Sequence, residues 1–517
     1  MAERAQQMRF RNLGLALALG FILGAVALGF LPLLWLGLGQ WAFHYDDYLP
    51  RVVLFTLKQA SLSTLLSAVI ALPVALAIAR RHFFGRDALL KIFALPLALP
   101  AIVAILGILG VYGASGPFGG MISIYGLSGI LLAHVFFNMP LAVRLMLTRL
   151  EAIPAENFRL AAQLDFKAAQ VFRFIEWPQL ASAIPGIASL IFLLCTASFA
   201  VVLILGGGPQ ATTLEVAIYQ SLRLDFDPAR ASILALAQLV TCGLLVLVAS
   251  RFATEVQVFA LTLTRTRRWD GRSLSSRLGD GAAIALAALI VLPPILSVVL
   301  SGLANVRADS LLLQATLTSL FIGIASASIS LVLGWVLAGT AARQPHSLLK
   351  AAITLACLAS LIMPPAVLAT GWFVSLSSFT DVSRYAVVLV IILNALMALP
   401  FVWSPLYPAI LDLVQRHDRL CSSLGLSGTA RLFLIDLPVL RKPLALAFLM
   451  AVIVSLGDLS AITLFGSDQL VTLPALIFRQ MGHYRMNDAA GTALVLAAFC
   501  FVLITLSQRW SQTHDQT

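Results

Sequence analysis

Long apolar runs, each separated from the next by a short polar or charged stretch, occupy most of the 517 residues. A helix needs about 20 mainly apolar residues to cross the hydrocarbon core of a bilayer. By that criterion the pattern predicts twelve spans, six in each half of the chain. They fall near 12–38, 59–79, 91–112, 127–148, 182–205 and 229–250, and near 280–301, 312–341, 350–376, 385–408, 443–464 and 488–508. The predicted fold is all-α and integral to the membrane.

The composition supports this interpretation and argues against a soluble protein. Hydrophobic residues make up 60% of the chain and charged residues 11%, which is too apolar for a soluble domain. In a soluble protein the net charge of +11 would suggest nucleic acid, but in a membrane protein the location of the positive residues matters more. The partner we expect is a lipid bilayer and not nucleic acid. The five cysteines are scattered without a CxxC motif, so neither a disulfide framework nor a metal site is predicted.

The positive residues set the predicted orientation. Residues 12–38 carry no charge and follow three arginines; this run exceeds the apolar core of a signal peptide, about 7–15 residues, so we expect an uncleaved first span. With both termini in the cytoplasm, 26 of the 34 Lys and Arg residues fall in predicted inside segments. Cytoplasmic loops are the ones enriched in Lys and Arg, so this orientation is the one predicted.

Two polar segments interrupt the apolar pattern and match each other without a gap. Loop 1 is Arg159–Pro178, RLAAQLDFKAAQVFRFIEWP, and loop 2 is Arg419–Pro438, RLCSSLGLSGTARLFLIDLP. Each matched pair of residues is 260 positions apart, as are Pro140 and Pro400 in the apolar runs. A fixed separation between matched residues indicates a duplicated unit. Both loops lie in segments predicted to face the cytoplasm.

The shared pattern of the two loops has a physical reason. A helix must end, turn and restart, and the turn favours a residue that tolerates positive φ, Gly first and Asp or Asn next. Gly425 and Asp165 occupy that position. Pro438 and Pro178 then suit the first turn of the following helix, where no N–H is needed. An interfacial helix without a partner would have a similar pattern, but two copies in register favour loops that bind a partner.

Both loops resemble the cytoplasmic EAA loop of ABC importer permeases, which reads EAA, three residues, Gly, nine residues and I-x-L-P. The EAA triplet is replaced by Arg-Leu-Ala and Arg-Leu-Cys, and Trp177 replaces Leu. The resemblance assigns ATPase coupling to Arg159, Ala161, Asp165, Ile175 and Pro178 and to Arg419, Leu424, Gly425, Ile435 and Pro438.

The resemblance also implies an architecture. It predicts about 12 transmembrane helices in two tandem six-helix repeats of the type I, MetI-like permease. The predicted divisions are a first half 1–250, a basic cytoplasmic linker 251–279 and a second half 280–517. Because each half has an even number of spans, the two halves form a direct repeat with the same orientation.

No catalytic motif accompanies these loops. None of the five lysines follows a glycine, so the chain contains no Walker A sequence, and GxSxG and HExxH are also absent. We therefore expect a pore-forming subunit that is not an enzyme and binds no cofactor. The resemblance implies two copies of a cytoplasmic ABC ATPase, which would bind ATP and Mg²⁺, and a periplasmic substrate-binding protein.

The segment from Gly457 to Leu494, together with loop 1, resembles the thiamine ABC transporter permeases of Gram-negative bacteria. That resemblance implies a bacterial inner membrane protein that carries thiamine or its phosphates. Fused ferric-iron permeases share the two-loop layout, and neither composition nor spacing separates the two substrates. The resemblance also implies that the binding protein docks on the outer segments Thr213-Leu214-Glu215 and Thr472-Leu473-Pro474.

Few ionisable or amide side chains lie inside the predicted spans. Asp458 is the notable one, and the matched residue in the first half is Ser198. Because a carboxylate at mid-membrane costs about 2.5–3.5 kcal/mol on insertion scales, Asp458 should face a partner or a wet path. The candidate translocation residues are Asp458, Ser198, Asn138 and Asn394, with helix packing as the alternative role. An ion-coupled secondary transporter would need buried relays in both halves, and a lone Asp458 argues against that class.

Overall fold

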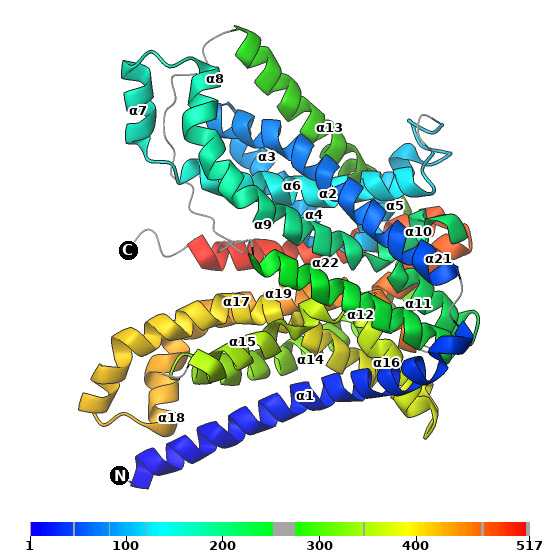
Figure 1. The fold of residues 1–517 in the computed structure, drawn as a ribbon, viewed down its shortest axis with the longest axis vertical. Coiled ribbons are helices and arrows are strands. Elements are labelled where there is room, and N and C mark those ends of the chain that lie inside the picture. Colours follow the sequence, from blue (N-terminus) through cyan, green and yellow to red (C-terminus); the bar gives the residue numbers. More distant parts are fainter. Residues whose placement is uncertain are drawn as a thin grey trace. The chain divides into compact units, whose positions relative to one another are not determined.

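The computed structural model describes residues 2–44, 47–81, 83–120, 123–251, 274–344, 347–466 and 470–512. Within these ranges every regular element is a helix (Figure 1). Ten of these helices are long and apolar enough to cross a membrane, and an eleventh span results if one bent pair is counted. The prediction of an all-α membrane protein is confirmed. Residues 252–273, most of the predicted linker, lie outside the described residues.

The order of elements in the first half recurs in the second. The first half contains α1 (Ala2–His44), α2 (Tyr48–Arg80), α3 (Arg86–Ile92), α4 (Leu95–Ala98), α5 (Ala101–Tyr112), α6 (Leu127–Glu151), α7 (Ala155–Gln163), α8 (Ala168–Val171), the π-helix η1 (Phe172–Glu176), α9 (Trp177–Thr196), α10 (Phe199–Leu205), the 3₁₀ turn η2 (Pro209–Ala211), α11 (Leu214–Arg223) and α12 (Pro228–Arg251).

The second half contains α13 (Leu274–Asn305), α14 (Ser310–Ala341), α15 (Ser347–Ile362), α16 (Pro365–Ser377), the 3₁₀ turn η3 (Val382–Tyr385), α17 (Ala386–Ser423), α18 (Gly428–Arg431), the π-helix η4 (Leu432–Asp436), α19 (Leu437–Leu456), α20 (Ser460–Phe465), α21 (Leu473–Gly482) and α22 (Met486–Gln512). The helices α9 and α19 begin and end 260 residues apart, as the sequence matches require.

Four predicted spans are not continuous helices: those near 91–112, 182–205, 350–376 and 443–464. Two of them break at a proline. The span expected near 91–112 bends by 111° between its two parts, at Pro100. The span expected near 350–376 ends as α15 and restarts as α16 after Pro364. Proline lacks an N–H and forces the preceding residue out of the helical region, and Leu99 is accordingly extended with ψ 132°. Both spans lie near their predicted positions, and the prolines account for the breaks within them.

A second difference concerns the approach to the two loops. In the first half α6 ends at Glu151 and α7 begins at Ala155, whereas α17 runs without interruption from Ala386 to Ser423. Pro154 lies in the gap between α6 and α7, and the residue 260 positions later is Val414. Pro154 is the N-cap of α7 with an extended ψ of 138°, so the helix is interrupted there in the first half and continuous at Val414 in the second.

The chain forms two compact units that do not follow its two halves. One unit comprises Met1–Tyr45, Ala217–Leu239 and Asn305–Thr517, and the other comprises Asp46–Val216 and Val240–Ala304. The first helix of each half therefore packs with most of the other half. Helix α1 lies along α14, α15 and α16 (Figure 1). The division of the chain into halves 1–250 and 280–517 describes the sequence repeat and stays a prediction. The two compact units have different boundaries.

Glycines allow the first helix of each half to pack closely against a helix of the other half. A Cβ atom at Gly371 of α16 would lie 1.7 Å from the carbonyl oxygen of Gly29 in α1, and one at Gly107 of α5 would lie 2.3 Å from the carbonyl oxygen of Pro294 in α13. Small residues allow membrane helices to approach this closely. Around the first crossing, the indole N–H of Trp372 donates to the carbonyl of Ala25 at 2.8 Å. The contact between α1 and α16 thus depends on the absence of a side chain at residue 371.

We expect Gly371→Val to weaken the packing of α1 on α16, because the new side chain would collide with backbone that cannot move aside. Overpacking of a tight contact costs about 1–3 kcal/mol. Thermal unfolding of the detergent-solubilised chain, followed by size-exclusion chromatography, should begin at a lower temperature. Gly20→Val is the matched control, since no atom lies within 4 Å of a Cβ at Gly20. Equal thermal stability of the two variants would contradict the proposed crossing.

Candidate functional site

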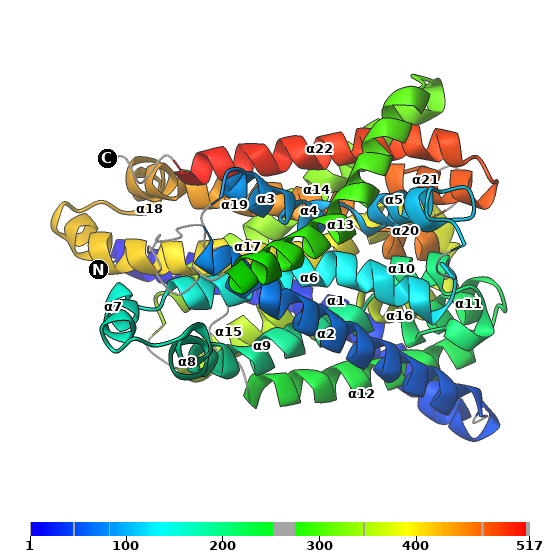
Figure 2. The same cartoon turned by 90° about the horizontal axis from the view of Figure 1, so that it is seen from above.

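Loops 1 and 2 have the same local architecture at the same register. In each, a helix ends, a left-handed turn follows, and a four-residue helix leads through a five-residue π-helix into α9 or α19. In loop 1 these elements are α7, α8 and η1, and in loop 2 they are the end of α17, α18 and η4. Figure 2 shows α7 and α8 beyond one end of α9, and Figure 1 shows α18 beside the far end of α17. The loops are therefore projections from helix ends.

The turn in each loop is made as the sequence predicts. Asp165 has φ 52° and Gly425 has φ 67°. The backbone N–H of Phe166 donates to the carbonyl of Ala161, and the N–H of Leu426 to that of Cys421, both at 2.9 Å. This six-to-one bond is the Schellman pattern that ends helices. The expectation that this position needs a residue tolerant of positive φ is confirmed.

The restart of the helix also matches the expectation. Pro178 and Pro438 are the second residues of α9 and α19, where no intrahelical N–H is required. Among the other predicted coupling residues, Ala161 is buried and Leu424 is 63% exposed. Arg159, Arg419, Asp165 and Gly425 are exposed, and Ile175 and Ile435 are half-buried. Their role in coupling stays a prediction.

A buried ion pair ties loop 1 to the end of α2. Glu176, the last residue of η1, is fully buried, and its Oε2 lies 3.7 Å from Nη2 of Arg80. Arg80 also pairs with Asp280 of α13 at 3.2 Å, and Arg81 approaches the same carboxylate at 2.6 Å. A buried carboxylate is retained where it is paired. A displacement of loop 1 would therefore act on α2 and α13 as well as on α9.

Loop 2 has a carboxylate at the matched position but a different connection. Asp436 Oδ1 lies 3.3 Å from Nε of Arg431 within the same loop. Arg431 also pairs with Asp418, and Asp418 Oδ2 lies 3.9 Å from Nε of Arg343, just beyond α14. The connection from the loop to α14 thus runs through two intermediate side chains, whereas in loop 1 it is direct.

Of the apolar side chains that both loops expose, sequence reasoning identified Leu424 alone. Leu160 and Leu420 are 56% and 49% exposed, and Leu164 and Leu424 are 59% and 63% exposed. Phe174 and Leu434, 59% and 63% exposed, form the third matched pair. Each pair is 260 residues apart. Exposed apolar patches mark interaction sites, and the recurrence of these exposed side chains at matched positions of the second loop favours that interpretation.

Asn138 and Asn394 lie inside α6 and α17, within predicted spans, and each bonds to the end of a neighbouring helix. Nδ2 of Asn138 in α6 donates to Sγ of Cys195 at 3.2 Å, and Nδ2 of Asn394 in α17 donates to Oγ of Ser455 at 3.0 Å. Cys195 and Ser455 are the penultimate residues of α9 and α19, and both asparagines are buried. These bonds hold neighbouring helices together, so the geometry favours the packing role. A place in the translocation path stays an untested prediction.

Asp458 lies in the break between α19 and α20. Its Oδ1 accepts from the N–H of Ser460 at 3.0 Å, and its Oδ2 from the N–H of Ala461 at 3.2 Å. The carboxylate therefore caps the first turn of α20, where N–H groups lack helical partners. It also lines a cavity of about 10 Å³ with Asn394 and Ser455, which is room for about one water molecule. Ser198, at the matched break before α10, makes no side-chain cap.

The outer segments expected to receive a binding protein are not available for docking. Leu214 and Leu473 are fully buried, and the threonines beside them are buried as well. The N–H of Leu214 donates to the Thr56 hydroxyl at 3.0 Å, and that of Leu473 to the Ser319 hydroxyl at 2.8 Å. That expectation is wrong for these side chains, because each segment forms the buried start of α11 or α21.

Comparison with known proteins identifies the class of this architecture. A family model described as "Binding-protein-dependent transport system inner membrane component" matches residues 330–516. The chain is 45% identical over 524 residues to the thiamine transport system permease protein ThiP of Brucella abortus (strain 2308), with 97% of this chain and 95% of that protein covered. The ThiP proteins of Escherichia coli K12 and Salmonella typhimurium LT2 are 44% and 43% identical, with 94% of each chain covered.

The chain belongs to the ThiP family of thiamine transport system permeases. The matched family model covers most of the second half, including α17, loop 2 and α19. A multi-pass permease of a binding-protein-dependent system accounts for the many membrane-spanning helices. Over the part of the chain that the structure describes, no group of three or more His, Cys, Asp or Glu side chains is placed to hold a metal ion.

We expect Gly425→Val to disorder loop 2, because a β-branched residue is strained at the φ of 67° by about 1–2 kcal/mol. Limited proteolysis of membranes should cleave the variant within 419–438 sooner than the wild-type chain. Gly425→Asn is the control, since Asn tolerates this region of backbone space, and it should resemble wild type. Equal protection of the Val and Asn variants would show that the turn does not limit loop stability.

We expect Asp458→Asn to lower transport more than abundance. The amide oxygen of Asn can still accept from the first turn of α20, so the helix cap survives while the charge in the cavity is lost. Membrane abundance by immunoblot and substrate uptake per molecule are the two measurements. Uptake per molecule equal to wild type would leave Asp458 with the capping role alone.

Proposed function

We propose that the chain is the membrane-spanning permease subunit of an ABC importer that brings thiamine, or its phosphates, into the cytoplasm. The assignment of thiamine as the substrate rests on the near full-length similarity to permeases named for thiamine transport. The observation that supports the mechanism is the recurrence of one loop geometry, with matched exposed apolar side chains, at 260-residue spacing. Two equivalent loops fit two copies of one partner.

The partner we propose for the loops is a cytoplasmic ABC ATPase subunit, two copies of which would bind and hydrolyse MgATP. The exposed side chains of Leu164 and Leu424 would enter a groove on each subunit, with the short helices α8 and α18 beside them. Ion pairs at Glu176 and Asp436 would pass a movement of each subunit to α2 or α14. Orientation follows from the positive residues, with both termini and both loops in the cytoplasm.

A periplasmic substrate-binding protein completes the proposed importer of the bacterial inner membrane. The direct test is reconstitution of the chain with the ATPase and binding protein in proteoliposomes. ATP-dependent uptake of radiolabelled thiamine that requires all three proteins is the expected result. Uptake driven by an ion gradient, with the chain alone, would identify a secondary transporter. Uptake of ferric iron without uptake of thiamine would identify ferric iron as the substrate.

We expect Leu164→Glu and Leu424→Glu each to weaken ATPase binding, because a carboxylate cannot be desolvated in an apolar groove without cost. Co-purification of the ATPase with the tagged permease from solubilised membranes is the measurement, and the double variant should retain the least. Phe379→Glu is the control: Phe379 is 89% exposed and lies near the opposite end of α17. Undiminished co-purification with the double variant would reject the loops as the ATPase site.

A further inference from the structure

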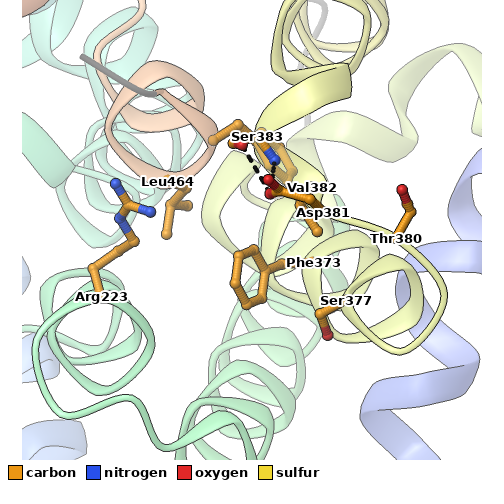
Figure 3. A pocket seen from close by; sticks show the side chains of 9 residues that line it. Arg223, Phe373, Ser377, Thr380, Asp381, Val382, Ser383 and Leu464 are labelled. Carbon is orange, nitrogen blue, oxygen red and sulfur yellow. Dashed lines mark hydrogen bonds between the residues drawn. The ribbon is translucent and has the colours of Figure 1, made fainter.

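A cavity of about 330 Å³ lies among α11, α16, η3 and α20, at the end of α17 opposite loop 2. Its size is within the range of small-molecule sites, which run from about 300 Å³ upward. Figure 3 shows its wall, with Phe373 between Arg223 on one side and Asp381 and Thr380 on the other. Phe465 of α20 closes part of the wall and stacks on the buried Trp372 at 6.5 Å between ring centres.

The charged groups of this cavity are fixed in place and are not paired with each other. Oδ1 of Asp381 accepts from the backbone N–H of Ser383 at 3.0 Å and from its hydroxyl at 2.8 Å. Arg223 donates from Nη2 to the carbonyl of Gly466 at 3.1 Å. Over the ranges that the structure describes, Arg223 and Asp381 form no salt bridge. Each retains capacity for a ligand, the carboxylate through Oδ2 and the guanidinium through its other N–H groups.

The carboxylate of Asp381 is suited to remain ionised. The Ser383 hydroxyl, and after it the Ser383 N–H, lower the pKa of Asp381 below its ordinary value. Hydrogen bonds to the charged form of a carboxylate act in that direction. The aromatic face of Phe373 beside a carboxylate offers a cation both cation–π attraction and a counter-ion.

We propose that this cavity binds a planar aromatic cation whose tail carries a hydroxyl or phosphate group. Asp381 and Phe373 would contact the cationic ring, and Arg223 would contact the tail. The proposal rests on the proposed function in naming thiamine and its monophosphate as such ligands. Within the predicted orientation the cavity opens to the periplasmic side, so it would receive substrate there.

The carboxylate of this cavity comes from the second half alone. The segment that follows α5 in the first half, residues 113–126, contains no charged residue, whereas the segment that follows α16 contains Asp381 and Arg384. Leu464 and Phe465, at the end of α20, line the cavity, and the same six-residue helix begins next to Asp458. The chain would therefore have a single substrate site of this composition, with Asp381 and Phe373 from the second half and Arg223 from the first.

Direct binding to the purified full chain tests the site without the partners. Radiolabelled thiamine should bind, and Asp381→Asn and Phe373→Ala should each weaken binding roughly fivefold or more, as loss of a counter-ion or a cation–π contact predicts. Thiochrome is an uncharged product of the same ring system, so it does not need the carboxylate of Asp381. Its affinity, measured by competition with radiolabelled thiamine, should be the same for Asp381→Asn and the wild-type chain. Arg223→Gln should weaken binding of thiamine monophosphate more than binding of thiamine.

Two matched controls guard against effects on folding. Asp309→Asn removes an exposed carboxylate that caps α14 by accepting from Leu312 at 2.7 Å, and Phe379→Ala removes an exposed ring outside the cavity. Both should bind thiamine as the wild-type chain does. Unchanged binding in Asp381→Asn and Phe373→Ala, equal losses in the controls, or no binding of thiamine to the wild-type chain at millimolar concentration would each overturn the site.

The outcomes separate the site from the proposed function. If the reconstituted importer fails to transport thiamine while Asp381 and Phe373 govern thiamine binding, the site stands and the transport assignment falls. If the complex transports thiamine at wild-type rates with Asp381→Asn and Phe373→Ala together, the function stands and the site falls.

Discussion

Backbone polar groups inside a membrane must find partners within the protein, and the rest of this structure depends on that constraint. The apolar runs satisfy it by forming helices, so a break is tolerated only where other groups replace the lost bonds. At the break between α19 and α20 the carboxylate of Asp458 takes over the N–H groups of the next turn. Asn394 ties the preceding helix end to α17. Polar side chains thus satisfy the backbone and the helix ends at this break.

The two loops show one backbone geometry achieved by different residues. Asp165 and Gly425 adopt the same left-handed turn, and the carboxylates of Glu176 and Asp436 end matching π-helices. Their ionic connections differ, since Glu176 reaches Arg80 directly and Asp436 reaches Arg343 through Arg431 and Asp418. Ion pairs thus connect each loop to a helix that lies well before it in the chain, α2 in one half and the end of α14 in the other.

The halves differ where the substrate would be met. The cavity lined by Asp381, Phe373 and Arg223 belongs to the unit built mostly from the second half, and the equivalent first-half segment has no charge to offer. Under the proposed function, duplication would supply two similar connections to two ATPase subunits, while a single solute would need a single site. Helix α20 runs from the Asp458 cap to the wall of this cavity.

The sequence by itself determined the class of fold, most span positions, the left-handed turns at Asp165 and Gly425 and the family, because these depend on local composition and on residues at fixed spacing. It did not reveal that Leu160 and Leu420 are exposed, or that Arg80 reaches Glu176, since both depend on which helices become neighbours. The breaks at Pro100 and Pro364 were visible as prolines, but proline is tolerated in continuous helices too. Only the tertiary structure decided that α1 packs on α16 at Gly371, because a contact between residues hundreds of positions apart leaves no periodic trace in the chain.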